Sequence, residues 1–151
     1  MQNDLKGFVS TSIIKLPYLR ELILSNNDIT FQFDGIADAQ RLEYLYLDNT
    51  NLGSIAGIGN AQNLITLQIA DNELTGAIPY ELYLLTTLHE LDLGYNYFSG
   101  KIPNVIGALT GLTSLFIYHN QFTGRLPAGL GDLTGLTLLN LAEWNSKCPK
   151  P

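Results

Sequence analysis

Hydrophobic and polar residues alternate in a short unit whose clearest copy is Leu88 to Phe98, LHELDLGYNYF. Leu91 and Leu93 alternate with Glu90 and Asp92, and this period of two predicts a short β-strand with one buried face. Asn96 follows where the chain must turn away, and its amide can bond backbone groups that no strand partner reaches. A strand this short cannot bury its face alone, so the unit needs neighbours of the same shape.

Those neighbours are present, because the frame occurs six times. The copies begin at Leu19, Leu42, Leu64, Leu88, Leu112 and Leu136, so the steps are 23, 22, 24, 24 and 24 residues. This period is typical of leucine-rich repeats. We therefore predict an α/β fold: a right-handed leucine-rich-repeat solenoid with six parallel strands on a concave sheet and short 3₁₀ or helical turns on the convex side. One such domain is expected over residues 1–151.

Polar residues recur at one position after each strand. Asn27, Asn72, Asn96 and Asn120, with Thr50 in the second copy, should form a hydrogen-bonded ladder. The last copy has Trp144 in this place. Asn3-Asp4-Leu5 resembles the tail of a further repeat without its strand, so we expect a fragment of a longer array with Leu22 and Leu139 poorly covered. Cys148 is either half of a capping disulfide or part of a frayed end.

The segments between strands predict turns rather than long helices. The last three share Gly76, Gly100 and Gly124 at one position, where a positive φ or a close backbone approach is expected. Pro79, Pro103 and Pro127 then fix φ just before a short helical turn, a favoured first helical position. Leucines three apart, as at Leu82 and Leu85, suit a 3₁₀ turn. The earlier segments, 30–41 and 53–63, are shorter and glycine-containing, which favours tight turns.

The motif L-T-G-x-I-P in these three segments resembles the plant-type repeat of receptor-like kinases, receptor-like proteins and polygalacturonase-inhibiting proteins. The repeat frame covers nearly the whole chain, and the subtype motif covers Leu74 to Leu136. The resemblance implies recognition of a protein or peptide outside the cell or at its surface. A secreted inhibitor of a hydrolase, using the same face, is the first alternative.

Composition narrows the functional classes. The 151 residues contain no apolar run long enough for a membrane span and no signal-peptide pattern at the start. The absence of a signal peptide and of an N-x-S/T sequon favours an intracellular, cytoplasmic scaffold as a second alternative. A formal net charge of −6 disfavours nucleic acid as a partner.

The outward positions of the six strands carry all of that net charge. They hold seven acids and one base, Arg20, while the remainder of the chain is balanced. The acids are Glu21, Glu43, Asp48, Asp71, Glu90, Asp92 and Glu143. The same face exposes aromatic residues, which are enriched in binding hot spots. We predict that a ligand with basic and apolar groups binds Tyr44, Tyr46, Gln68, Asp71, Glu90, Asp92, Tyr95, Phe116, Tyr118 and His119.

Catalysis has little support in the sequence. His89, His119, Glu90 and Asp92 could lie near one another, and a histidine beside carboxylates can act as an acid or base. No nucleophile, oxyanion donor or metal-ligand spacing accompanies them, so we expect neither an enzyme nor a cofactor or metal site. Ice binding, known among similar repeat proteins, would need a flat, threonine-rich and uncharged face, which the acidic strands do not offer.

Overall fold

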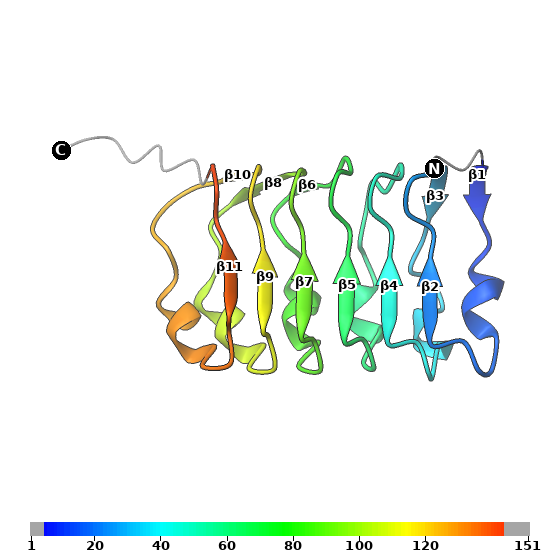
Figure 1. Ribbon diagram of the computed structural model, residues 1–151. Coiled ribbons are helices and arrows are strands. Elements are labelled where there is room, and N and C mark those ends of the chain that lie inside the picture. The colour runs from blue at the N-terminus through cyan, green and yellow to red at the C-terminus, as the bar shows by residue number, and fades with distance from the viewer. Residues whose placement is uncertain (1–4, 144–151) are drawn as a thin grey trace.

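A six-stranded parallel sheet lines one face of the molecule in the computed structural model, which describes residues 5–143 (Figure 1). Its strands are β2 (Glu21–Ile23), β4 (Tyr44–Tyr46), β5 (Thr66–Gln68), β7 (Glu90–Asp92), β9 (Ser114–Phe116) and β11 (Leu138–Asn140), paired in this order. Each strand comes from one copy of the leucine frame. The predicted solenoid fold is confirmed.

Short 3₁₀ helices form the convex side, as the spacing of three predicted. They are η1 (Thr11–Lys15), η2 (Ile36–Asp38), η3 (Ile58–Asn60), η4 (Tyr80–Leu84), η5 (Asn104–Ala108) and η6 (Ala128–Asp132). Gly76, Gly100 and Gly124 have φ of 76°, 81° and 85°, as expected.

The three prolines lie just before each 3₁₀ helix, as predicted, and they occupy the N-cap rather than the first helical position. Pro79, for example, combines φ −59° with an extended ψ of 138°. Pro103 and Pro127 are likewise extended. Each proline therefore ends the extended segment, and the helix begins at the next residue.

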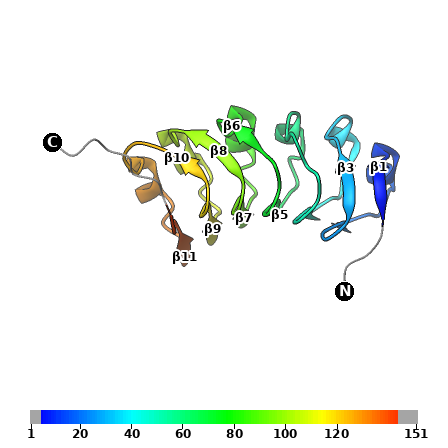
Figure 2. The same cartoon turned by 90° about the horizontal axis from the view of Figure 1, so that it is seen from above.

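Two smaller sheets on the flank were not predicted. In the first, β1 (Lys6–Val9) pairs in parallel with β3 (Asp28–Phe31). In the second, β8 (Tyr97–Gly100) lies between β6 (Thr75–Gly76) and β10 (Gln121–Phe122). Figure 2 shows these strands behind the concave sheet, where each repeat turns toward the convex side.

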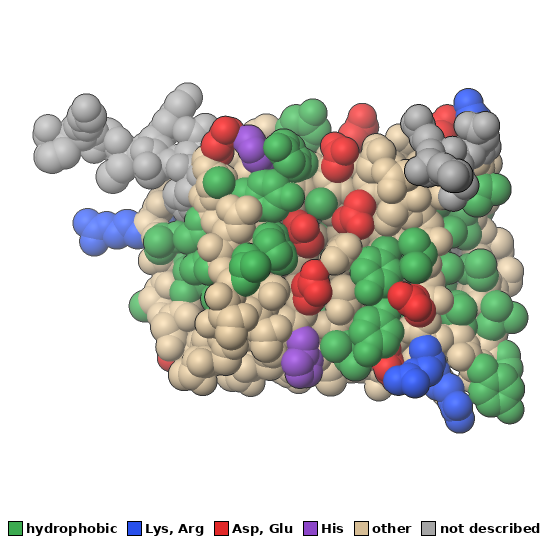
Figure 3. Space-filling view, in the orientation of Figure 1, with side chains coloured by type: hydrophobic (Ala, Val, Ile, Leu, Met, Phe, Trp, Pro, Cys, Tyr) green, Lys and Arg blue, Asp and Glu red, His purple; other side chains and the backbone are tan. Residues whose placement is uncertain are grey.

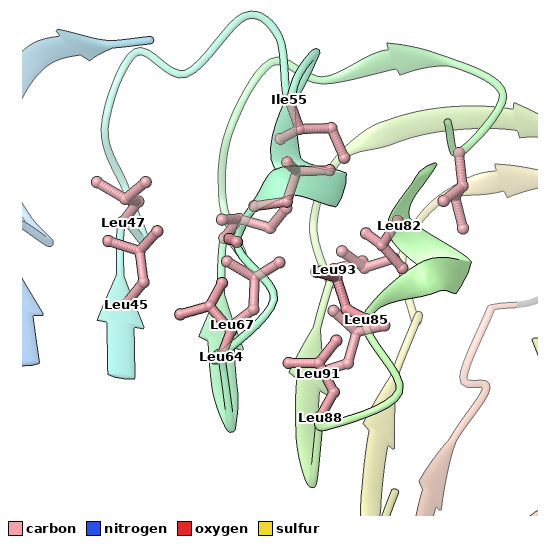
Figure 4. Close-up of a cluster of buried hydrophobic side chains, with 14 of the residues drawn as sticks. Leu45, Leu47, Ile55, Leu64, Leu67, Leu82, Leu85, Leu88, Leu91 and Leu93 are labelled. Atoms are coloured by element: carbon pink, nitrogen blue, oxygen red, sulfur yellow. The ribbon is translucent and has the colours of Figure 1, made fainter. Parts of the chain in front are cut away.

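Columns of aliphatic side chains fill the space between the concave sheet and the 3₁₀ helices (Figure 4). Leu45, Leu67, Leu91 and Leu115, one from each of four successive strands, are all 0% exposed. The predicted ladder lies just after the C-terminal ends of the concave strands, and it is confirmed. Its members Asn27, Thr50, Asn72, Asn96 and Asn120 are all buried.

The two ends of the array are covered differently. Leu139 in β11 is 42% exposed, as expected, whereas Leu22 in β2 is only 6% exposed, so the expectation of poor cover is wrong there. Leu22 belongs to the same buried cluster as Ile14 of η1, which packs over this end. Trp144 and Cys148 lie outside the described residues. Among residues 5–143, no helix is long and apolar enough to cross a membrane.

Candidate functional site

The strand register confirms the predicted row across the concave sheet. Tyr46 is paired with Gln68, Gln68 with Asp92, and Asp92 with Phe116. The space-filling view shows acidic side chains crossing the middle of this face, with hydrophobic groups on both sides (Figure 3). The row therefore joins aromatic, amide and carboxylate groups on one continuous surface.

Four aromatic rings form a continuous cluster over the C-terminal half of this face. The Phe116 and Tyr118 ring centroids are 6.5 Å apart, and those of Tyr95 and Tyr118 are 5.2 Å apart at an edge-to-face angle. Tyr95 stacks on His119 at 4.2 Å, with the two ring planes within 10°. The His119 Nδ1 lies 2.8 Å from a Glu143 carboxylate oxygen, which fixes the outer end of the cluster.

Asp92, at the centre of the sheet, is held in an environment that disfavours its charge. Burial raises the pKa of its carboxyl to about 6, and the nearby Asp48 and Glu90 carboxylates act in the same direction. The Gly94 amide, which donates to Asp92 Oδ1 at 2.8 Å, offsets only part of this effect. Burial likewise raises the pKa of Asp48, which accepts hydrogen bonds from the Ala70 amide and the Ser25 hydroxyl.

These central acids have no cationic partner within the described chain. The ion pairs formed by residues 5–143 use Asp28, Asp38, Glu43 and Glu143, and none reaches Asp48, Glu90 or Asp92. Glu90 instead accepts a hydrogen bond from the Gln68 amide at 2.8 Å. Half-buried carboxylates without a counter-ion destabilise the free protein and favour a bound cation.

A glycine brings the aromatic cluster against the acids. A Cβ built on Gly94 would lie 2.4 Å from Tyr118 Cε1 and 3.0 Å from Asp92 Oδ1, so any larger residue would displace the tyrosine ring. The ring lies over the end of β7 as a result. Burial raises the pKa of Tyr118, and the nearby charge of Asp92 acts in the same direction.

The remaining predicted residues lie at the margins of this arrangement. Tyr44 and Tyr46 are half-buried on β4, on the other side of the acids from the four-ring cluster. Asp71 is exposed beyond the end of β5. Glu43, on the same face, is neutralised by the Arg20 guanidinium, whose Nε donates at 3.1 Å.

The structure also shows two features that sequence reasoning missed. Asp48 is one of the half-buried acids of the site and was not among the predicted ligand-binding residues. The residue before each ladder position adopts a positive φ. These residues are Asn26, Asn49, Asp71, Tyr95, His119 and Glu143. Their shared position in the frame was the available signal, but only the asparagines, the aspartate and the histidine suggest this conformation by residue type.

The grouping of histidines and acids considered for catalysis does not form. His89 precedes β7 and bonds the Thr87 carbonyl through Nδ1, at 2.9 Å, whereas His119 follows β9 and pairs with Glu143. They therefore lie at opposite ends of neighbouring strands. No group of three or more His, Cys, Asp or Glu side chains in residues 5–143 is arranged to hold a metal ion.

Comparison with known proteins agrees with the geometry. The leucine-rich repeat family model matches residues 87–109 and 111–133. A search of curated proteins finds no match. Among solved structures, the ectodomain of the Arabidopsis thaliana membrane receptor kinase GASSHO1/SCHENGEN3 is 36% identical, with a TM-score of 0.85 over 93% of this chain and 17% of that one.

Two other similar structures are a second receptor kinase and an ice-binding protein. The Arabidopsis receptor kinase HAESA is 32% identical, with a TM-score of 0.84 over 94% of this chain and 24% of that one. A plant ice-binding protein is 30% identical, with a TM-score of 0.71 over 83% of this chain and 42% of that one. The chain thus spans less than half the length of these proteins. The chain has the leucine-rich-repeat solenoid fold and is similar to the ectodomains of plant receptor kinases.

Proposed function

We propose that the concave face binds a protein or peptide ligand that carries basic and apolar groups. The observation that carries this proposal is the placement of Asp48 and Asp92. Both are half-buried, without a cationic partner in the described chain, and they lie near the aromatic cluster around Tyr118. A lysine or arginine of a ligand would supply the missing charge, and the aromatic rings would pack against its apolar groups.

The similar structures support a peptide as the ligand. The GASSHO1/SCHENGEN3 ectodomain is described in complex with CASPARIAN STRIP INTEGRITY FACTOR 2, and HAESA in complex with the peptide hormone IDA and the co-receptor SERK1. By this analogy the chain acts outside the cell or at its surface, as part of a receptor-like ectodomain. The alternative function is that of a secreted hydrolase inhibitor. In that case the ligand of the same concave face would be the hydrolase.

The ice-binding similarity does not favour a role for this face in ice binding. Two carboxylates, Glu90 and Asp92, stand on the central strand β7, and the row through Asp92 combines side chains of different size from Tyr46 to Phe116. Such a surface is neither flat nor uncharged. The chemistry of the concave face therefore fits a basic ligand better.

Two substitutions separate the roles of the aromatic and acidic groups. Phe116→Ala removes an apolar anchor and should speed dissociation, by ~2 kcal/mol or more if the ring is a hot spot, while leaving the association rate unchanged. Asp92→Asn removes a steering charge and should lower the association rate and flatten its salt dependence. The two effects are measured by surface plasmon resonance at several salt concentrations.

The probe is the strongest binder from an array of synthetic peptides that vary in Arg, Lys and aromatic content. Tyr80→Ala is the matched control, because Tyr80 is a 63% exposed aromatic residue on η4, on the convex side. Binding that is insensitive to Phe116→Ala and Asp92→Asn but lost with Tyr80→Ala would reject the concave face. Selection of acidic peptides by the array would also contradict the proposal.

A further inference from the structure

A second surface, on the flank of the solenoid, has the opposite charge to the concave face. An open groove of about 680 Å³ lies where the last two described returns leave the flank sheet. We call it the flank groove. It is lined by Lys101, Ile102, Pro103, Asn104, Gly124, Arg125, Leu126, Pro127 and Ala128. Two of these nine side chains are basic and none is acidic, although the chain as a whole has a net charge of −6.

The repeat places the two cations on neighbouring segments that line one groove. Lys101 and Arg125 each follow the positive-φ glycine of their repeat, at Gly100 and Gly124. The strands that precede them, β8 and β10, are paired in parallel, with Phe122 opposite Gly100. Within residues 5–143 neither cation forms an ion pair with an acid. Two like charges that line one groove without a counter-ion repel each other and attract an anion.

Gly124 holds the lysine side chain along the groove. A Cβ on Gly124 would lie 3.2 Å from Cγ of Lys101 and 3.4 Å from its Cε, so the aliphatic part of the lysine runs across this glycine. The long stem packs against backbone while its ammonium group stays free to contact a ligand. The direction of Lys101 is therefore fixed by the neighbouring repeat rather than left to solvent.

The floor of the groove is closely packed. The Gly129 amide donates to Asn104 Oδ1 at 3.4 Å, and a Cβ on Gly129 would lie 2.0 Å from the Asn104 carbonyl oxygen. Only a glycine allows η5 and η6 to approach this closely. A preorganised floor lowers the entropy that a ligand must lose on binding.

Apolar surface accompanies the cations. Leu126 is 53% exposed, whereas Ile78 and Ile102, its counterparts in the two preceding repeats, are 9% and 5% exposed. Pro103 and Pro127 also line the groove. This mixture suits a peptide with alternating acidic and apolar side chains better than a small inorganic anion, which would leave the apolar area uncovered.

We propose that the flank groove is a second binding site, which takes an acidic and partly apolar segment of a partner protein. Lys101 and Arg125 contact its carboxylates, and Leu126 with the two prolines contacts its apolar side chains. The site stands apart from the concave face and does not depend on the ligand proposed there. The chain would thus contact a basic ligand on one surface and an acidic partner on another.

The test measures fluorescence anisotropy of a short dye-labelled peptide of alternating Glu and Leu residues. In the double variant Lys101→Gln/Arg125→Gln the affinity should fall roughly tenfold, because two partly exposed charge pairs are lost. Leu126→Ser should weaken binding of the same peptide at high salt. Salt screens the charge pairs under that condition, so the apolar contact supplies most of the remaining affinity.

The matched control is Lys6→Gln/Lys15→Gln. It changes the net charge by the same amount at the other end of the solenoid, where these lysines pair with Asp28 and Asp38. The affinity of this control variant for the peptide should stay within about twofold of that of the parent chain. Surface ion pairs are weak, and charges far from the groove are screened by salt. An equal loss in both double variants, or a loss in neither, would overturn the proposal.

Two further outcomes would also contradict it. The first is competition by a single-stranded oligonucleotide that carries the same net charge as the peptide. Such competition would show that the groove binds anions in general and does not select an acidic, partly apolar peptide. Sedimentation velocity tests whether a second copy occupies the groove, since its acidic concave face has the required charge. Salt-sensitive dimers that are lost in Lys101→Gln/Arg125→Gln but kept in the control would assign the groove to self-association rather than to a partner protein.

Discussion

Asp92 lowers the stability of the protein that carries it. Its pKa is raised to about 6, so between its ordinary pKa and that value the folded state keeps a proton that the unfolded state releases. The free energy of unfolding therefore falls as pH rises through this window, and the loss persists at pH 7. A central carboxylate that weakens the fold is typical of a group kept for binding.

We predict that Asp92→Asn raises the free energy of unfolding by about 1–2 kcal/mol at pH 7, less than the full pKa shift implies because solvent screens the group. At pH 3 the gain should vanish, since the parent carboxyl is then protonated in both states. Urea denaturation at the two pH values measures the difference. Glu73→Gln, at an exposed acid, is the control, and an equal gain there would point to net charge instead.

Tyr83 is a second residue whose chemistry conflicts with its surroundings. It occupies the position that is glycine in three other returns, at Gly59, Gly107 and Gly131. Its side chain is 2% exposed, and its hydroxyl has no hydrogen-bond partner among the described residues. Tyr83→Phe should keep the packing, remove the unpaired hydroxyl and stabilise the fold by ~1 kcal/mol in urea denaturation. A clear destabilisation would mean that the hydroxyl is hydrogen-bonded after all.

At the scale of elements, the strands and helices that could be predicted are those with a regular spacing of hydrophobic side chains. The six concave strands follow from the leucine period, and the 3₁₀ helices follow from leucines three apart. The flank strands could not be predicted in this way. Their segments are short, and pairs such as Thr75–Gly76 and Gln121–Phe122 have no hydrophobic alternation to reveal them. They form because parallel stacking brings equivalent backbone segments within hydrogen-bonding distance.

The same limit applies to the candidate site. The row from Tyr46 to Phe116 could be predicted, because register follows from the repeat. The raised pKa of Asp92 and the place of Tyr118 over Gly94 could not, since both depend on packing between neighbouring repeats. Asp48 was missed for that reason: its burial is a property of the stack and not of its own strand.

The ladder offers an element-scale test. The Asn72 amide oxygen accepts from the Thr50 and Leu52 amides, and its nitrogen donates to the Leu47 carbonyl at 2.8 Å. Asn72→Ala leaves several buried groups unpaired, each worth ~1–3 kcal/mol, and should destabilise strongly. Thr50→Ala, in the same ladder, removes a hydroxyl with two partners and should cost less. The comparison uses urea denaturation, and equal costs would argue against a continuous network.

At the scale of the whole molecule, stability should vary along the array. In a solenoid each repeat contacts only its neighbours, so an inner repeat gains two interfaces and an outer one gains fewer. Leu91 in β7 is 0% exposed with strands on both sides, whereas Leu139 in β11 is 42% exposed at the edge of the sheet. The two leucines occupy equivalent positions in their repeats, which makes them a matched pair.

We predict that Leu91→Ala lowers the free energy of unfolding by ~2–5 kcal/mol through lost transfer and a central cavity. Leu139→Ala should cost less than ~1 kcal/mol, because much of that side chain already contacts water. Denaturation followed by circular dichroism measures both. Hydrogen exchange should show the same gradient, with amides of β7 better protected than those of β11. Equal costs for the two leucines, with uniform protection, would mean that the array unfolds as one unit whose C-terminal end is as well packed as its centre.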